Sequence, residues 1–306
     1  MKFGIRTILK SSIKCHSGKS FKANIASFIL FSLMFFCLAV TVSASDKKGV
    51  GLADLRAPER IAQLNVAWYY TWQPQAIPGA PLEKFVPMLR SRGGRLLKEQ
   101  ISFFQTKGKV PLLLVLNEPD KFKGDNMSVE EVIRVWPEIS VLADQISSPA
   151  PAGVLGSWFD KFYRKAKSQH FKFDFMAVHL YSPPDAELFL KKIDAVYEKY
   201  QIPIWITEFA VADWESKDKP NSNRYTEAQV LAFMKSVLPE LEKRPYVVRY
   251  AWFGAGKHSL SHEQVRTSRL FEKDGKLTPL GHYYAEFEWP LKQVKLKVKS
   301  LEQSEE

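Results

Sequence analysis

Two glutamates stand directly after short apolar runs of the kind that form buried strands. Asn117-Glu118-Pro119 follows residues 110–116, and Thr207-Glu208-Phe209 follows residues 202–206. Cleavage of a glycosidic bond needs two carboxyl groups: one protonates the leaving oxygen, and the other attacks the sugar or activates water. A single carboxylate after a strand is more often part of a solvated edge. The prediction of glycosidase chemistry therefore depends on the two glutamates together, and from the residues alone their roles stay unassigned.

The separation of the two carboxyl groups would decide the stereochemistry of the reaction. A retaining enzyme holds them about 5–5.5 Å apart, and an inverting enzyme about 6.5–9.5 Å. Sequence does not measure this distance. For Glu118 to act as the acid, we expect its pKa to be raised by partial burial or by the negative charge of Glu208.

The rest of the chain predicts the frame that positions these glutamates. Short apolar segments alternate with longer amphipathic ones, which is typical of β/α units around a parallel sheet. Most of the apolar segments are continuous, as in strands that are buried on both faces. The predicted strands lie at residues 50–53, 64–70, 85–89, 110–116, within 142–149, 175–180, 202–206 and 247–253, and the clearest helices at 129–139, 186–200 and 227–241.

Eight such strands over residues 45–290 predict a single α/β domain with the (β/α)8 TIM-barrel architecture, whose usual size is roughly 250 residues. A doubly wound open sheet is the alternative, but it would place a glycine-rich phosphate loop after the first strand, and the sequence has none there. In a barrel, active residues stand at the carboxyl ends of the strands. The fourth and seventh strands lie across the barrel mouth, so Glu118 and Glu208 can face a sugar from both sides.

Aromatic side chains near the predicted strand ends are candidate sugar platforms, because sugars present flat C–H faces to aromatic rings. For Trp68 we expect core packing instead. The candidates for the substrate site are Tyr70, Trp72, Tyr181, Trp214 and Trp252.

Taken together, the motifs resemble glycoside hydrolase family 128, a family of retaining barrels with a glycosyl hydrolase catalytic core. The resemblance covers nearly all of residues 48–288. It is carried by Phe85-Val86-Pro87-Met88-Leu89, Leu116-Asn117-Glu118-Pro119-Asp120, Ser148-Pro149-Ala150, Asp174-Phe175-Met176-Ala177-Val178-His179, Trp205-Ile206-Thr207-Glu208-Phe209, Arg249-Tyr250-Ala251-Trp252-Phe253 and Gly275-Lys276-Leu277-Thr278-Pro279-Leu280-Gly281.

The resemblance implies a barrel that cleaves β-1,3-glucan, with Glu118 as acid/base and Glu208 as nucleophile. It further implies that Asn117 hydrogen-bonds the sugar 2-hydroxyl, and that His179 and Tyr181 line the site near the nucleophile. The chain departs from the family pattern at Thr71, Arg90 and Leu180, where the family commonly has asparagine, tryptophan and tryptophan. These are subsite positions, so the departures concern which glucan is bound, and whether cleavage is endo or exo, rather than catalysis.

The first 44 residues predict a signal peptide. Six basic residues and no acids precede an apolar run at residues 25–42, and Val42-Ser43-Ala44 is a pattern that signal peptidase cuts. A signal-anchor is the alternative, although the run is at the short end for a membrane span. Both cysteines, Cys15 and Cys37, lie in this leader. Without it, 38 basic residues remain against 33 acidic ones, a net charge of +5 that gives little reason to expect nucleic-acid binding.

The sequence predicts no cofactor and no metal site. His258 and His262 have the spacing of a metal pair, but no third ligand is suitably spaced, and a serine nucleophile elbow is absent. We expect a secreted or periplasmic monomer that acts on a β-glucan saccharide and ends in a charged tail at residues 291–306. The alternatives are a carbohydrate-binding barrel without turnover, or a transglycosylase that uses the same two glutamates.

Overall fold

Eight parallel strands form the centre of the molecule. The computed structural model describes residues 42–54, 56–256 and 262–290; the predicted leader up to residue 41, His258 and the predicted tail lie outside these ranges. A five-stranded sheet has the order β3-β2-β9-β8-β7, with β3 at Trp68–Tyr70, β2 at Lys48–Gly51, β9 at Val247–Trp252, β8 at Ile204–Val211 and β7 at Met176–Ser182. A three-stranded sheet has the order β4-β5-β6, with β4 at Met88–Leu89, β5 at Val110–Asn117 and β6 at Ala143–Ala150.

Two isolated parallel bridges connect the two sheets. Tyr69 of β3 pairs with Phe85, just before β4, and Ser147 of β6 pairs with Phe175, just before β7. Each strand from β3 to β8 therefore lies beside the strands that precede and follow it in the chain, and β9 lies beside β2. All eight predicted strand positions contain a strand, so the prediction of a single α/β domain with parallel strands is confirmed.

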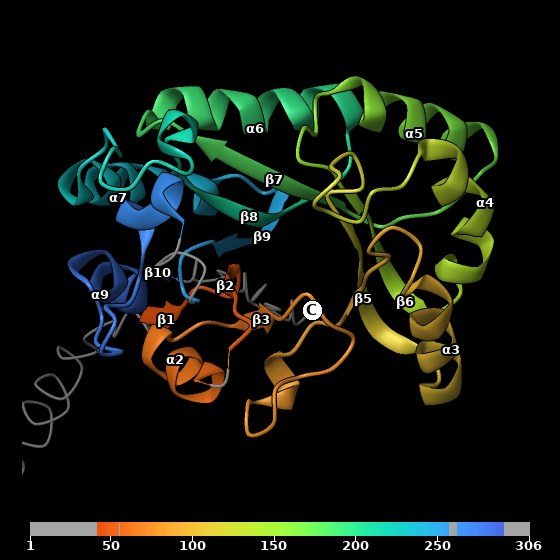
Figure 1. Cartoon of the computed structure of the whole chain (residues 1–306), viewed down its shortest axis with the longest axis horizontal. Coiled ribbons are helices and arrows are strands. Elements are labelled where there is room, and N and C mark those ends of the chain that lie inside the picture. Colours follow the sequence, from red (N-terminus) through yellow and green to blue (C-terminus); the bar gives the residue numbers. More distant parts are fainter. Residues whose placement is uncertain (1–41, 55, 257–261, 291–306) are drawn as a thin grey trace, which may run out of the picture. The chain divides into compact units, whose positions relative to one another are not determined.

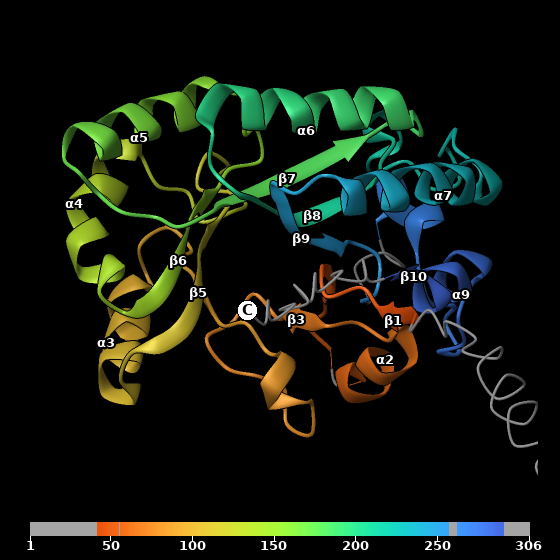
Figure 2. The ribbon, with the colours of Figure 1, turned by 180° about the vertical axis from the view of Figure 1, so that it is seen from behind.

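Helices run around the outside of the strands (Figures 1 and 2). Capping boxes begin two of them, at the predicted helices 129–139 and 227–241: Ser128 and Glu131 at α4, and Thr226 and Gln229 at α7. None of the helices in the described ranges is long and apolar enough to cross a membrane. The helices are α2 (Ala57–Leu64), α3 (Leu97–Lys107), α4 (Val129–Ser140), α5 (Ser157–Ser168), α6 (Ala186–Tyr200), α7 (Glu227–Lys243) and α9 (Pro279–Glu286).

The core has two parts, as expected for strands that are buried on both faces. The larger part fills the space between strands and helices. The smaller part draws side chains from both sheets and includes Trp68, which is buried as predicted. Its aromatic rings pack closely: the centroid of Trp205 lies 5.2 Å from Trp68 and 4.3 Å from Phe175. The side chains between the strands therefore form a filled core.

Two adjacent lysines hold the ends of helices α7 and α9. The ammonium of Lys47 donates to the carbonyl oxygens of Leu241, Glu242 and Arg244 at the end of α7. The buried ammonium of Lys48 donates at 2.8, 3.1 and 3.0 Å to those of Tyr284, Ala285 and Phe287 at the end of α9. Helix carboxyl ends carry unpaired carbonyls and partial negative charge, which a cation satisfies. Beside them, β1 (Val42–Ala44) pairs with β10 (Glu288–Pro290), a contact that the sequence did not predict.

We expect Lys48→Met to lower the free energy of unfolding by about 3 kcal/mol, because three charge-assisted hydrogen bonds are lost in a buried site. Burial lowers the pKa of Lys48 to about 8, so the ammonium remains charged at neutral pH. Urea denaturation measures the change. Lys276→Met is the matched control, since that side chain is 83% exposed and its loss should cost less than about 0.5 kcal/mol. Equal effects of the two substitutions would contradict the prediction.

Candidate active site

A cavity of about 430 Å³ opens at the carboxyl ends of the strands. Both predicted catalytic glutamates line it, together with side chains from the loops that follow β3, β4, β5 and β9. The side chains that line the cavity include Trp72, Arg90, Asn117, Glu118, Tyr181, Glu208, Trp214 and Phe253.

Glu118 is held at the end of β5 by an unusual backbone conformation. Its φ is 48°, in the left-handed region, and that of Leu116 is 57°. Non-glycine residues in this region cost free energy and persist where the surroundings fix them. Here the Glu118 amide donates to Ala150 at 2.7 Å. A Cβ on Gly124 would lie 2.1 Å from the Glu118 carbonyl oxygen, so only glycine fits against this turn.

Glu208, in β8, is a buried carboxylate with three neutral donors. Its side chain is 7% exposed. One oxygen accepts from Trp72 Nε1 at 2.8 Å and from Tyr70 Oη at 3.4 Å, and the other accepts from Tyr181 Oη at 2.6 Å. Burial and the charge of Glu208 raise the pKa of Tyr70 and Tyr181 well above 10, so both hydroxyls stay protonated as donors. These contacts satisfy the buried carboxylate and fix its orientation.

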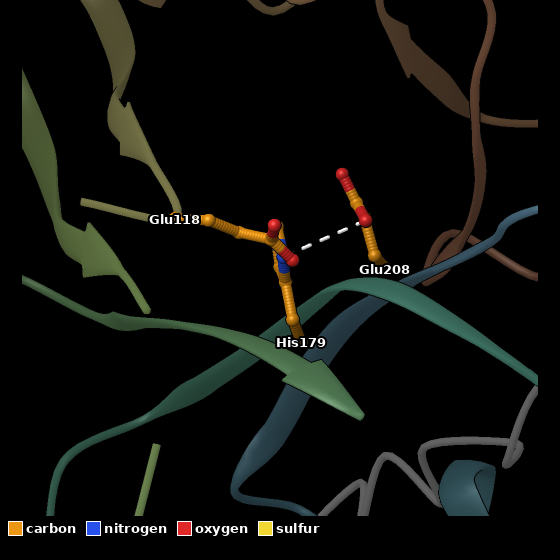
Figure 3. Close-up of side chains that lie close together, drawn as sticks. All are labelled: Glu118, His179 and Glu208. Atoms are coloured by element: carbon orange, nitrogen blue, oxygen red, sulfur yellow. Dashed lines mark hydrogen bonds and ion pairs between the residues drawn. The ribbon is translucent and has the colours of Figure 1, made fainter. Parts of the chain in front are cut away.

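His179, in β7, lies between the two glutamates (Figure 3). Its Nδ1 is 3.2 Å from an oxygen of Glu118 and 3.5 Å from an oxygen of Glu208, while Nε2 has no partner among the described residues. Burial lowers the pKa of His179, but the charge of Glu208 and the hydrogen bond to Glu118 outweigh it, and the net direction is upward. A single nitrogen of the His179 ring therefore lies close to both carboxylates.

The expected direction of the Glu118 pKa is wrong. Burial does raise the pKa of Glu118, as anticipated, but the hydrogen bond from His179 and its positive charge outweigh burial, and the net direction is downward. No local pattern indicates that the side chains of Glu118 and His179 touch, because the two residues are 61 positions apart in the chain. In the resting site the proton consequently belongs to His179 more than to Glu118.

The three side chains also have the arrangement of a candidate cation site. Glu118, His179 and Glu208 each offer a ligand atom, and these atoms lie within 4.8 Å of one another. However, both oxygens of Glu208 already accept hydrogen bonds from tyrosine and tryptophan donors. Those donors suit a free carboxylate better than a metal ligand, and two carboxylates at this separation already suit glycoside cleavage.

The structure places most of the other predicted site residues at this cavity. Asn117, Trp72, Tyr181 and Trp214 line it, and Trp214 is 55% exposed with its ring against the edge of Tyr181. Tyr70 is fully buried and contacts the site through Glu208.

The prediction that Trp252 belongs to the substrate site is wrong, because its side chain does not reach the cavity. It is fully buried, donates through Nε1 to Ser268 at 2.8 Å and packs against Phe209. Successive side chains along a strand point to opposite faces. The next residue, Phe253, lines the cavity instead. Gln73, Arg92, Lys123 and Gln264 also line the cavity, although the sequence did not predict them as site residues. His262, which was considered only as a metal ligand, lines the cavity too.

Comparison with known proteins agrees with this geometry. The family model described as glycosyl hydrolase catalytic core matches residues 49–284. A glycoside hydrolase family 128 subgroup I endo-β-1,3-glucanase of Amycolatopsis mediterranei, solved with laminaritriose and laminaribiose, is 27% identical with a TM-score of 0.66, over 79% of this chain and 99% of that one. A subgroup V exo-β-1,3-glucanase of Cryptococcus neoformans is 25% identical with a TM-score of 0.62, over 78% and 98% of the two chains.

Two further proteins are similar to this chain. A subgroup VII oligosaccharide-binding protein of Trichoderma gamsii, at 22% identity and a TM-score of 0.62 over 78% and 92% of the two chains, shares the fold. Alkali-sensitive linkage protein 1 of Schizosaccharomyces pombe is 25% identical over 252 residues, 79% of this chain but only 45% of its own length. The resemblance to glycoside hydrolase family 128 is confirmed, and the chain belongs to the glycosyl hydrolase catalytic core family.

Proposed function

We propose that this chain hydrolyses β-1,3-glucan with retention of configuration, through two glutamates. The observation that carries the proposal is the pair itself: an oxygen of Glu118 and an oxygen of Glu208 lie within 4.8 Å of each other at the cavity. That proximity favours the retaining separation of about 5–5.5 Å over the inverting one. The β-1,3-glucanases that resemble this chain support the choice of substrate.

The reaction runs as a double displacement. A Glu208 oxygen attacks the anomeric carbon, the bond to the leaving sugar breaks, and Glu118 delivers to the leaving oxygen the proton that it shares with His179. The product is a glycosyl ester on Glu208. Water then attacks the same carbon while Glu118 takes its proton, and the Glu208 carboxylate is released. The donors on Glu208 hold the attacking oxygen in place throughout.

We infer that strands β2 to β9 close into a (β/α)8 barrel. The two bridges between the sheets and the pairing of β9 with β2 support this closure. Their side chains also share one filled core. In such a barrel β5 and β8 are the fourth and seventh strands, which accounts for the way Glu118 and Glu208 face each other.

The shape of the groove favours endo cleavage. A second cavity of about 720 Å³ adjoins the catalytic cavity, and the two share Ala53, Thr71 and Gln73. A third cavity of about 390 Å³ also adjoins it, and these two share Arg90, Arg92 and Lys123. Among the described residues the groove thus continues beyond the catalytic cavity at two places, which leaves room for a long glucan chain.

Hydrolysis of a linear β-1,3-glucan by the full chain tests the proposal. We expect new reducing ends and a mixture of oligosaccharide lengths at early times, with equal rates in EDTA. Release of glucose alone would favour exo cleavage, and loss of activity in EDTA would favour a metal site. Binding without turnover on β-1,3-, β-1,4- and mixed-linkage glucans would favour the carbohydrate-binding alternative. Longer oligosaccharides without net hydrolysis would indicate transglycosylation.

We further propose that the protein acts as a monomer outside the cytoplasm after loss of residues 1–44. The basic and apolar pattern of the leader supports export. Cleavage before Ser45 would also remove strand β1 from its pairing with β10. N-terminal sequencing of the exported protein identifies the bond that is cut, and an intact leader would indicate a signal-anchor.

The pH dependence of turnover should report the proton shared by Glu118 and His179. As pH rises through the raised pKa of His179, the pair loses this proton, and Glu118 can no longer protonate the leaving oxygen. We expect the alkaline limb of kcat/KM to lie above 6.5, the ordinary value for imidazole. In His179→Gln, which keeps a hydrogen-bond donor but holds no extra proton, the limb should shift down by roughly one pH unit or more. A lower kcat with an unmoved limb would make His179 a purely structural residue.

A further inference from the structure

One end of the groove is lined by cations without matching acids. The third cavity lies against Arg90, Arg92 and Arg95, from the chain that follows β4, and Lys123, from the loop that follows β5. Its lining contains no aspartate or glutamate. Phe122, at the same place, is 86% exposed. The end of the groove that begins at Arg90 is therefore both positively charged and open.

The buried acid that pairs with Arg90, Asp125, is held by several hydrogen bonds. Asp125 is completely buried. One of its oxygens accepts from Arg90 Nε at 2.8 Å and from the Arg92 amide at 3.0 Å, and the other accepts from the Asn117 amide at 2.7 Å. Asp125 thus fixes the Arg90 guanidinium and the turn that carries Glu118, and both of its oxygens already accept hydrogen bonds.

The terminal nitrogens of Arg90 consequently remain available at the cavity. The side chain is 10% exposed, and its one ion pair within the described ranges is through Nε. Arg92, Arg95 and Lys123 form no ion pair within those ranges. Two arginines elsewhere are neutralised by ion pairs: Arg224 pairs with Asp213, and Arg244 pairs with Asp194. Uncompensated like charges around one cavity repel each other and favour an anionic ligand.

We propose that this end of the groove is a subsite for an anionic group on the sugar chain, a uronate carboxylate or an acidic ester such as sulfate. The inference rests on the proposed glycan-cleaving function, because the cavity shares Arg90, Arg92 and Lys123 with the catalytic cavity. A ligand here is thus continuous with the chain that the glutamates cut. The planar fork of Arg90 suits a carboxylate or sulfate oxygen pair, and Lys123 supplies a point charge. Phe122 offers an exposed ring for the sugar that carries the anion.

Calorimetric titration of the full-chain Glu208→Gln protein, which should bind without turnover, tests this subsite. The probes are a neutral β-1,3-gluco-oligosaccharide, the same oligosaccharide with glucuronate units, and its sulfated form. We expect the acidic oligosaccharides to bind about three- to tenfold more tightly than the neutral one, with the advantage shrinking as salt is added. The acidic form with the larger gain in affinity, glucuronate or sulfate, identifies the anionic group that the subsite binds.

The substitution Arg92→Gln combined with Lys123→Gln should bring the ratio of acidic to neutral affinity close to one. Both residues are exposed, so the fold should survive, which thermal unfolding checks. The matched control is Arg134→Gln combined with Lys191→Gln, exposed residues of α4 and α6 outside the cavity linings, with the same change in net charge. This control should keep the preference for acidic oligosaccharides.

Several outcomes would overturn the subsite. Equal affinities for acidic and neutral oligosaccharides would do so, as would loss of the preference in the control variant, since the attraction would then come from overall charge. Tighter binding of a single-stranded oligonucleotide, lost in the Arg92 and Lys123 variant, would assign the cations to a nucleic acid instead. If wild type cleaves the neutral glucan while acidic groups bring no gain, only the subsite fails. If no oligosaccharide binds or is cleaved, the proposed function fails with it.

Discussion

We expect Glu208→Gln to lower kcat on β-1,3-glucan by about 10⁴-fold or more. The substitution preserves size and leaves one oxygen to accept a hydrogen bond, but an amide does not form the glycosyl ester on which the first displacement depends. Because Glu208 is buried among Trp72, Tyr70 and Tyr181, the neutral side chain should remain in the same position. The measurement is the rate of reducing-end release, with thermal unfolding as a check on the fold.

A matched control separates loss of the nucleophile from loss of charge. Glu286→Gln makes the same chemical change on α9, where the side chain is 76% exposed, and should leave the rate unchanged. Residual activity of more than a few per cent in Glu208→Gln would remove Glu208 from the nucleophile role. A normal rate in both variants would instead place the reaction elsewhere in the groove.

Replacing Glu118 with alanine should give a loss that depends on the leaving group. With glucan, whose leaving oxygen needs a proton, we expect kcat to fall by about 10²–10⁴-fold. With an aryl glycoside whose phenolate leaves without protonation, the first displacement should stay fast, and the glycosyl ester on Glu208 should accumulate as a burst of phenolate. The second displacement is then slow, because no base activates water.

Added azide distinguishes the two glutamates, since it needs no base to attack. In Glu118→Ala, azide should restore turnover and give the β-glycosyl azide by attack on the ester of Glu208. In Glu208→Ala, azide would take the place of the missing nucleophile and give the α-glycosyl azide. NMR of the products reads the anomer directly. The opposite pattern would exchange the two roles, and an α-configured first product from the wild type would indicate inversion.

Local patterns in the sequence predicted much of this structure. The apolar runs at β5 and β8 placed Glu118 and Glu208 correctly at one cavity, since strand length and direction are local properties. The predicted helices at 129–139 and 227–241 correspond to α4 and α7 for the same reason. Trp252 was misplaced, because a continuous apolar strand does not reveal which alternate side chains face the groove.

Features that depend on tertiary contacts could not be predicted from the sequence. Nothing near His179 in the chain indicates that its ring touches Glu118 and reverses the expected direction of the carboxyl pKa. Arg90 was noted only as a departure from the family pattern. Its orientation depends on Asp125, and the charge of its cavity depends on Lys123; both residues lie on a different loop. Electrostatics depends on distances in space, so the charge of this end of the groove emerged only with the fold.

The contacts of Lys48 and of strand β2 with the distant end of the domain determine when, during synthesis, this part of the chain can reach its final structure. Lys48 is joined to Phe287 across 239 residues, and β2 has no partner at β9 until Val247–Trp252 exist. At roughly 5–20 residues per second, a ribosome needs about 10–50 s to supply those partners after Lys48 has been incorporated. During that interval β2 has β3 beside it but lacks β9. The pairing of β2 with β9 therefore forms only after Trp252 has been synthesised, and until then the nascent chain lacks part of its final tertiary structure.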